Sequence, residues 1–391
     1  MRHSLMGQYI LRRLLQAIPL LIIITVIVFF LLKSAGDPLA ELSLDPRITE
    51  SDRLLKRAEY GVDDPLPIQF VHWLIGDDWY VRELELPASD TTFVAPNLCY
   101  GQEIPEGERV TLTLPNGTEQ VTLIKNNQCY RVFYQRNDNK GILRGDFGMS
   151  LARGRPVLEV MGQALPNTLL LGITSYLVII VFAFSLGIFQ AIRQYSFFDN
   201  VITTISFILV SMPIFLVALI SVYIFAVQFR KWGLPYLPVQ GMYSVNTDYS
   251  VGDLIRHMIL PVFCLAAISV AGYSRFVRAS MLEVINSDYI RTARSKGLGE
   301  RRITYVHALK NASLPLVTLM GLDIPFILAG AVVTERIFSW PGMGTLYIES
   351  LGRLDYTVVI AFVLMLAIAV VIFQLITDVL YAVLDPRVRY S

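Results

Sequence analysis

The sequence predicts an all-α polytopic membrane protein with six transmembrane helices and a small extracytoplasmic β-containing insertion between the first two. Hydrophobic residues make up 54% of the 391 residues, and charged residues only 17%, whereas soluble domains carry about 25% charged residues. Residues 34–164 contain 20 acidic against 13 basic residues, and the rest contain 12 against 20. The net charge of +1 therefore averages two regions of opposite character.

Six segments are long and apolar enough to span a bilayer. A spanning helix needs about 20 apolar residues, because in hydrocarbon the backbone must satisfy its own hydrogen bonds. The fourth segment is the weakest, since its apolar run is short. The predicted spans are Ile10–Leu32, Leu165–Ala191, Val201–Phe229, Ile255–Val277, Ser313–Val333 and Thr357–Val383.

Basic residues in the short loops predict the orientation. Arg12 and Arg13 before the first apolar run resemble a signal peptide with a cleavage site after Gly36, but the run is too long, so we expect a retained first span. The loop Arg275–Lys310 carries eight basic residues, which places it in the cytoplasm. Both termini are then cytoplasmic, and segments 34–164, 230–254 and 334–356 lie outside.

This orientation gives three predicted parts. Residues 1–33 form the N-terminal cytoplasmic segment and the first span. Residues 34–164 form an extracytoplasmic loop with a β insertion at about 76–140. Residues 165–391 form a five-helix core that includes a cytoplasmic loop at 281–314.

The insertion contains a β-hairpin signal. Val110, Leu112 and Leu114 alternate with threonines, and a second alternating run follows Asn116-Gly117. Asn-Gly favours a type I′ turn because both central residues need positive φ. A third strand is expected at Cys129–Tyr134. The insertion either binds a substrate or a partner protein, or it is a tolerated addition to an outer loop.

Two of the three cysteines lie in this exported part. Cys99 and Cys129 are the only cysteines outside the predicted spans. Because the exported side is oxidising, we expect them to form a disulfide. Cys264, within the fourth span, is expected to be a small packing residue.

A basic amphipathic segment lies between two spans on the cytoplasmic side. Asn286–Asp288 offers an N-cap and an acid in the first turn, and Gly297 can adopt the left-handed conformation that ends a helix. These signals predict a helix over Asp288–Lys296, followed by a second at about Glu300–Lys310. So short a helix is marginal alone, which favours docking into a partner; the alternative is that it lies on anionic lipid.

Several ordered motifs carry a family resemblance. The segments Asp288–Arg302 and His307–Pro315 resemble the EAA loop of ABC-importer permeases, specifically the dipeptide, oligopeptide and nickel branch. Arg291-Thr292-Ala293 stands where the general pattern has Glu-Ala-Ala, and the proline is delayed to Pro315, as is typical of that branch. The resemblance covers nearly the whole chain except about 76–140. Further similar stretches are Gly145–Leu151 with Leu165–Leu169, Thr334–Gly344 and Asp378–Arg387.

The resemblance implies a permease subunit of an ATP-driven peptide importer in the bacterial inner membrane, which forms half of the translocation pathway. It implies as partners a second homologous permease, two ATPases that hold ATP and Mg²⁺, and an extracytoplasmic substrate-binding protein. The helix Asp288–Lys296 is then the coupling helix, with apolar residues against the ATPase and basic residues paired with its acids. The implied coupling residues are Asp288, Thr292 and Gly297, the apolar Tyr289, Ile290 and Ala293, and the basic Arg291, Arg294 and Lys296.

Two further sites are candidates within the membrane body. Asp323 lies near the middle of the fifth span, where an ionised carboxylate is costly unless it faces water or a partner. It either lies on the translocation path, or pairs with the second permease or stays protonated. Trp340, Pro341 and Gly342 predict an outer element that is part of an external gate, or else a rigid turn anchored by an interfacial tryptophan.

Other function classes are less consistent with the sequence. An intramembrane enzyme lacks support, because neither His-Glu-x-x-His nor Gly-x-Ser-x-Gly occurs. A secondary transporter or channel is the main alternative, but it predicts more ionisable residues within the spans. No Gly-x-x-x-x-Gly-Lys-Ser/Thr loop occurs, so we expect no cofactor on this chain. Four His and three Cys disfavour a metal cluster, and no tract is basic enough for a nucleic acid.

Overall fold

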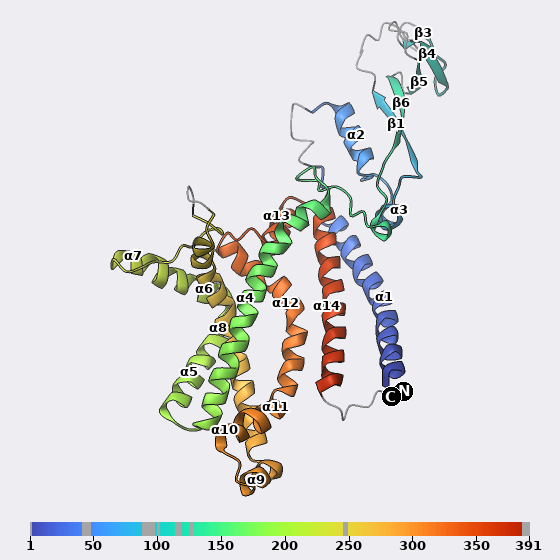
Figure 1. Cartoon of the computed structure of the whole chain (residues 1–391). Helices are drawn as coiled ribbons and strands as arrows, with labels where there is room; N and C mark the ends of the chain where they lie inside the picture. The colour runs from blue at the N-terminus through green and yellow to red at the C-terminus, as the bar shows by residue number, and fades with distance from the viewer. Residues whose placement is uncertain are drawn as a thin grey trace. The chain divides into compact units, whose positions relative to one another are not determined.

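The chain divides into two compact units in the computed structural model (Figure 1). The helical unit comprises Met1–Thr25, Glu159–Gly352 and Phe362–Ser391, and the mixed unit comprises Val26–Leu158 and Arg353–Ala361. The structure describes residues 2–40, 48–87, 98–99, 102–113, 119–125, 128–244 and 249–384.

Five helices in the described part of the chain are long and apolar enough to cross a membrane. They correspond to the predicted spans one to four and six, so the prediction of a mostly helical, multi-pass protein is confirmed. The fifth predicted span forms a single helix of 24 residues, α12 (Leu314–Ile337), which is not among the five. The five candidates are Ile10–Ser34 within α1 (Arg2–Ser34), α4 (Val157–Ile192), Ile214–Lys231, α8 (Val251–Ile285) and Tyr356–Val379 within α14 (Tyr356–Leu384).

The predicted third span, Val201–Phe229, is wrong as a single helix. Helix α5 (Phe197–Ser211) ends before Met212, whose extended backbone (φ −89°, ψ 133°) is typical of a residue that precedes proline. Pro213 then caps α6 (Ile214–Val222). A π-helical turn, η3 (Tyr223–Gln228), and α7 (Phe229–Lys231) continue α6. Hydropathy alone did not register this break, because Pro213 lies inside an apolar run.

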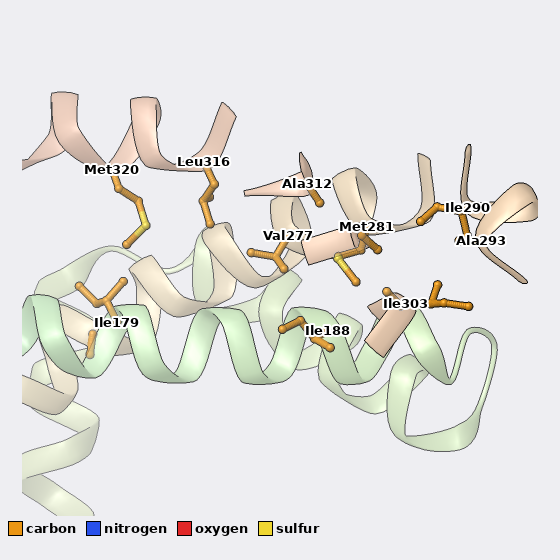
Figure 2. Packing of buried hydrophobic residues seen from close by; sticks show 13 residues of the cluster. Ile179, Ile188, Val277, Met281, Ile290, Ala293, Ile303, Ala312, Leu316 and Met320 are labelled. Carbon is orange, nitrogen blue, oxygen red and sulfur yellow. The ribbon is translucent and has the colours of Figure 1, made fainter. Parts of the chain in front are cut away.

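A hydrophobic cluster joins α4, α8 and α12 in the helical unit (Figure 2). Ile188 of α4 lies near Val277 and Met281 of α8, and Leu316 comes from α12. Each of these side chains is at most 6% exposed. The same cluster includes residues of the loop between α8 and α12, so that loop is packed against the helices that flank it.

A four-stranded antiparallel sheet, in the order β1-β6-β5-β4, forms part of the mixed unit. The predicted hairpin is confirmed, since β4 (Arg109–Thr113) pairs with β5 (Glu119–Lys125). Its Asn116-Gly117 turn lies outside the described residues. The predicted third strand is β6 (Gln128–Arg136).

Strand β1 (Val81–Pro87) was not predicted from the sequence, because it contains two glutamates and ends on a proline. It pairs with β6 along its whole length, with Leu84 opposite Phe133. A separate two-stranded pairing joins β2 (Leu98–Cys99) to β3 (Gln102–Glu103).

Two short helices precede the sheet in the mixed unit. A capping box formed by Thr49 and Asp52 starts α2 (Glu50–Glu59). Pro65 precedes α3 (Leu66–Ile75), whose aromatic side chains pack against Phe29. A 3₁₀ turn, η2 (Ile142–Arg144), follows β6.

The cysteines differ in state. Cys264 is free and buried in α8. Cys129 in β6 is disulfide-bonded, whereas the side chain of Cys99 lies outside the described ones. The predicted pairing of Cys99 with Cys129 therefore stays a prediction.

Gly187 sets the distance between α4 and α8. A Cβ at this position would lie 2.5 Å from Val277 Cβ and 2.7 Å from the carbonyl oxygen of Ser274. We expect Gly187→Ala to force the helices apart and lower the free energy of unfolding by roughly 1–3 kcal/mol. The measurement is thermal unfolding of the purified protein in detergent.

Gly162 supplies the control for this substitution. It lies in the same helix, and nothing lies within 4 Å of a Cβ built on it. Gly162→Ala should therefore be neutral, or stabilising by up to about 1 kcal/mol through helix propensity. Equal unfolding temperatures for the two variants would contradict the close approach.

Candidate functional site

The predicted cytoplasmic loop contains a short helix, as the sequence indicated. Helix α9 (Asp288–Ser295) ends one residue before the predicted boundary, with Lys296 as its C-cap. The predicted second helix is confirmed as a continuous helical run. It comprises α10 (Glu300–Arg302), the π-helical turn η4 (Ile303–Ala308) and α11 (Leu309–Ala312).

The inner face of α9 is buried in the chain itself. Ile290 is fully buried and Ala293 is 9% exposed, and both belong to the hydrophobic cluster with Met281 and Ile303 (Figure 2). In this structure both side chains are packed within the chain itself, and the expected contact of Ile290 and Ala293 with an ATPase stays a prediction. Of the three apolar candidates only Tyr289 is exposed, and its hydroxyl accepts a hydrogen bond from Asn311 at 2.9 Å.

The outer face of α9 carries the charges. Arg294 Nε lies 2.9 Å from Glu300 Oε1, so its charge is already paired within the loop. Arg291 lies 3.7 Å from Asp288 in a contact between strongly exposed side chains, which neutralises little. Lys296 is also exposed. Six side chains of the predicted coupling residues are thus accessible to a partner, and of these Arg294 is paired with Glu300: Asp288, Tyr289, Arg291, Thr292, Arg294 and Lys296.

Gly297 makes the turn after α9. Its φ is +76°, and its amide donates to the carbonyl of Arg294 at 2.9 Å. Nothing lies within 4 Å of a Cβ built on it. The requirement for glycine is therefore conformational and not steric.

An ion pair fixes the three helices next to the loop. Arg278 of α8 donates two hydrogen bonds to Asp199 of α5, at 2.9 and 2.8 Å. Asp199 also accepts from Gln190 of α4 and from the amide of Tyr195. The Arg278 guanidinium holds the pKa of Asp199 below its ordinary value. This pair was not singled out from the sequence, although both residues flank predicted spans, where a charge needs a partner.

The predicted outer element is an internal anchor. Trp340 is fully buried, and its Nε1 donates to the carbonyl of Asn167 at 3.0 Å. Asn167 Nδ2 in turn donates to the carbonyl of Pro341 at 2.8 Å. Two hydrogen bonds, one donated from each side, therefore hold this element against α4. The gate role of Trp340, Pro341 and Gly342 stays a prediction.

A buried carboxylate organises this element. Glu335 near the end of α12 is fully buried, and its Oε1 accepts from the hydroxyl of Thr168 at 2.6 Å. Its Oε2 accepts from the amides of Gly344 and Thr345, at 2.8 and 3.0 Å, at the start of α13 (Met343–Gly352). A Cβ on Gly342 would lie 2.3 Å from Glu335 Oε1. Sequence reasoning included Glu335 in a motif but assigned it no role.

The stretch Gly145–Leu151, which precedes α4 in the chain and lies in the mixed unit, is also held by a buried carboxylate. Asp355 is fully buried and accepts from the hydroxyl of Ser150 at 2.5 Å and from the amide of Leu151 at 3.1 Å. Gly148 takes φ +77°, and its amide donates to Asp146 at 2.9 Å. The stretch Gly145–Leu151 is therefore a carboxylate-held turn.

Asp323 is exposed on the helical unit and accepts a hydrogen bond from the hydroxyl of Tyr273. It lies apart from the other predicted site residues in sequence and in its contacts. Its pathway role and its role as a contact for a second permease both stay predictions.

Two family models match the chain. Residues 183–390 match the model described as binding-protein-dependent transport system inner membrane component. Residues 6–116 match a model described as the N-terminal part of a binding-protein-dependent transport system membrane component. Together the two matches include α9, the outer element and the first predicted span.

Curated relatives are similar over nearly the whole chain. The oligopeptide transport system permease protein AppB of Bacillus subtilis (strain 168) is 35% identical, over 98% of this chain and 100% of the relative. The dipeptide transport system permease protein DppB of Escherichia coli (strain K12) is 32% identical, over 99% and 100%. The glutathione transport system permease protein GsiC of Salmonella typhi is 31% identical, over 99% and 100%.

Replacing Glu335 tests its organising role. Glu335→Ala leaves the hydroxyl of Thr168 and the amides of Gly344 and Thr345 without an acceptor, at a cost of roughly 1–3 kcal/mol for each buried group. We expect a lower unfolding temperature and faster proteolysis after Trp340. Glu335→Gln keeps an oxygen for the two amides and should lose much less. Wild-type stability of Glu335→Ala would show that the carboxylate is dispensable.

Proposed function

Because the chain belongs to the family of binding-protein-dependent transport system inner membrane components, we propose that it imports peptides as the permease of an ATP-driven system. That it is a transport subunit of an ABC importer, in the inner membrane and crossing it several times, follows from the family and its relatives. The resemblance drawn from the sequence is thereby confirmed. The finer proposal concerns its substrate, its partners and its coupling to ATP.

Peptides are the proposed substrate class. Two of the relatives described above have oligopeptide and dipeptide permease in their names, and the third has glutathione, itself a peptide. The similarity to each extends over essentially the full length of both chains, which favours a shared kind of cargo over a shared fold alone.

The proposed complex contains this permease, a second homologous permease, two ATPases that hold ATP and Mg²⁺, and an extracytoplasmic substrate-binding protein. Both termini of this chain and the loop 281–314 are then cytoplasmic, and residues 34–164 are outside. In this arrangement α9 contacts an ATPase, and the pathway runs between the two permeases.

The observation that carries the coupling proposal is the two-sided character of α9. Its inner residues, Ile290 and Ala293, belong to the same cluster as Val277 of α8 and Leu316 of α12. Its outer side chains, Arg291 among them, are exposed. Since packed side chains transmit displacement, a partner that moves the outer face of α9 also moves the helices behind it.

The direct test is reconstitution. The chain is co-expressed with a homologous permease, two ATPases and a substrate-binding protein from the same organism, and the complex is placed in liposomes. We expect uptake of labelled alanyl-alanine that needs ATP and is inhibited by vanadate. Uptake of the same dipeptide by this chain alone would reject the proposal in favour of a secondary transporter or channel.

The turn after α9 supplies one prediction. Gly297→Val puts a β-branched residue at φ +76°, a conformation that costs about 1–2 kcal/mol for residues with a Cβ. We expect ATP-driven uptake to fall at least tenfold while membrane abundance stays normal. Gly297→Asn is the matched control, because asparagine tolerates the left-handed region. Unimpaired uptake by Gly297→Val would remove the turn from the mechanism.

The two arginines of α9 supply another prediction. Arg291 is weakly paired, whereas Arg294 is already neutralised by Glu300. We therefore expect Arg291→Gln to weaken binding of the ATPase several-fold, and Arg294→Gln to weaken it less. Pull-down of the ATPase at increasing salt checks this, since screening should abolish the difference. A greater loss of ATPase binding in Arg294→Gln than in Arg291→Gln would contradict this prediction.

A further inference from the structure

Helix α3 is apolar on the side that faces away from the protein. Ile68, Val71 and Ile75 are 42%, 42% and 40% exposed, and their spacing of three and four residues places them on one face of the helix. Gln69 and His72, the polar side chains of this helix, are instead buried, at 8% and 5% exposed. The polarity of α3 is therefore inverted relative to a helix on a water-exposed surface.

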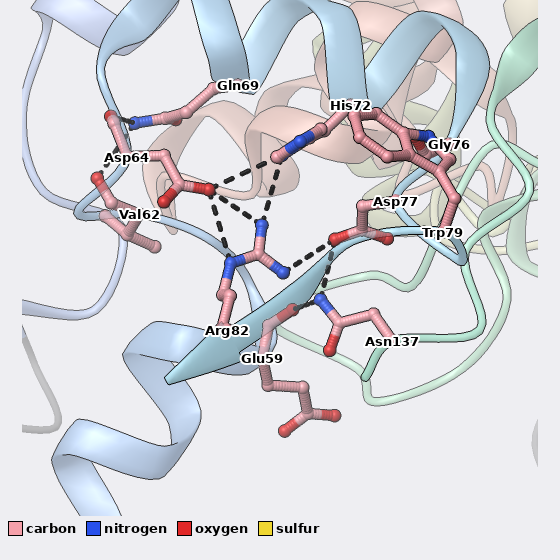
Figure 3. A network of polar contacts seen from close by, with 10 residues as sticks. All are labelled: Glu59, Val62, Asp64, Gln69, His72, Gly76, Asp77, Trp79, Arg82 and Asn137. Atoms are coloured by element: carbon pink, nitrogen blue, oxygen red, sulfur yellow. Dashed lines mark hydrogen bonds and ion pairs between the residues drawn. The ribbon is translucent and has the colours of Figure 1, made fainter. Parts of the chain in front are cut away.

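Internal hydrogen bonds hold the polar side of α3 against the mixed unit (Figure 3). Gln69 Nε2 donates to the carbonyls of Val62 and Asp64, at 2.8 and 2.7 Å. His72 Nδ1 lies 3.2 Å from Arg82 Nη2 of β1, and the same nitrogen of Arg82 lies 2.7 Å from Asp64 Oδ2. Because these contacts fix the rotation of α3 about its axis, its apolar face stays turned outward.

Helix α2 provides a comparison, because it has the same length and lies in the same unit. Its exposed side chains include Asp52, Lys56 and Glu59, and its buried residue is Ala58. This is the ordinary polarity of a helix that meets water. The inverted polarity of α3 thus needs an explanation of its own.

Helix α3 contacts the end of a membrane-spanning helix. The ring of Phe70 lies 5.3 Å from the ring of Phe29 and 6.4 Å from the ring of Phe30, both in the last two turns of α1. Leu31 in the same turns of α1 is 66% exposed. A helix in contact with the end of a span lies where the hydrocarbon core gives way to the headgroups. The exposed apolar surface of α1 thus has α3 beside it.

The length and exposure of α3 leave one environment for its apolar face. Its ten residues rise about 15 Å, which is half of the roughly 30 Å hydrocarbon core. An apolar helix of this length is either buried in a protein core or lies at the membrane interface. The exposure of Ile68, Val71 and Ile75 excludes a core helix. Trp79, just after the helix, is 57% exposed, and tryptophan is enriched at membrane surfaces.

We propose that α3 lies in the bilayer surface at which α1 ends, with Ile68, Val71 and Ile75 in contact with lipid acyl chains. The partner of this face is the membrane itself. Through Gln69 and His72, α3 then attaches the mixed unit to the bilayer at a second place besides α1. This interaction surface is additional to the proposed transport function, and it requires no ATPase, second permease or peptide.

The test measures lipid contact of α3 in the full chain, in nanodiscs of phosphatidylcholine and phosphatidylglycerol. Nitroxide spin labels are attached to Val71→Cys and, as the matched control, to Lys56→Cys on the polar side of α2. The unsubstituted chain, in which the free Cys264 is buried, is treated in parallel and its signal is subtracted. Collisions are measured with oxygen, which enters lipid, and with a nickel chelate, which stays in water.

We expect the ratio of oxygen to nickel collisions to be higher at Val71 than at Lys56 by about threefold or more, because an interfacial helix buries its apolar face at the boundary of headgroups and acyl chains. Nickel access at Val71 equal to that at Lys56 would show that the face lies in water, and would overturn the proposal. Protection of Val71 from both reagents would overturn it too, because protein then covers the face. Ile75→Cys, on the same face, repeats the measurement, so a folding defect in one variant does not decide the result.

This proposal and the transport proposal fail separately. Collision rates in nanodiscs measure the lipid contact of α3 without ATPases, and ATP-driven uptake in liposomes measures transport. A high ratio at Val71 and Ile75 supports the lipid contact even where the reconstituted complex takes up no peptide.

Discussion

A buried carboxylate without a basic partner is the constraint on which the connection from α12 to α13 depends. Glu335 is fully buried, and its described partners are a hydroxyl and two backbone amides. Burial of a carboxylate is tolerated only when its oxygens accept hydrogen bonds, so the positions of Thr168 and of the first turn of α13 are fixed. The carboxylate lies so close to Gly342 that a Cβ has no room there, and at Gly344 a Cβ would meet Val332 Cα at 2.5 Å. One side chain therefore sets the path from α12 through Trp340 to α13.

The chain uses the same device where other segments meet. Asp355 orders the turn that contains Ser150, and Asp199 joins α4, α5 and α8 with the help of Arg278. In an apolar body, packing alone is weakly directional, since one hydrophobic contact is about as good as its neighbour. A carboxylate with two or three donors is satisfied in only one geometry. These buried carboxylates therefore fix one conformation of the short connections, which hydrophobic packing alone would not do.

Much of the fold was predictable because its signals are local. Apolar runs predicted the long helices, and the alternation around Asn116-Gly117 predicted the hairpin strands β4 and β5. Strand β1 was not predictable, because its glutamates are tolerated only through pairing with β6, which lies more than 40 residues away. The roles of Glu335 and Asp199 were likewise not predictable, since their partners lie on other helices. Sequence showed that Asp288–Ser295 is amphipathic, but not that its apolar face packs against the chain's own core.

Burial of that face changes the physical argument for coupling. A helix of eight residues is unstable alone, so α9 must rest on something to persist. If Ile290 and Ala293 were kept for the ATPase, the free permease would expose an unsupported helix. With both residues in the cluster, α9 is held before any partner binds, and in the proposed complex the ATPase would contact only the exposed polar face of α9. The interactions that would bind a partner are then separate from those that fold α9. A partner that displaces α9 would also displace α8 and α12, because their side chains are already in contact.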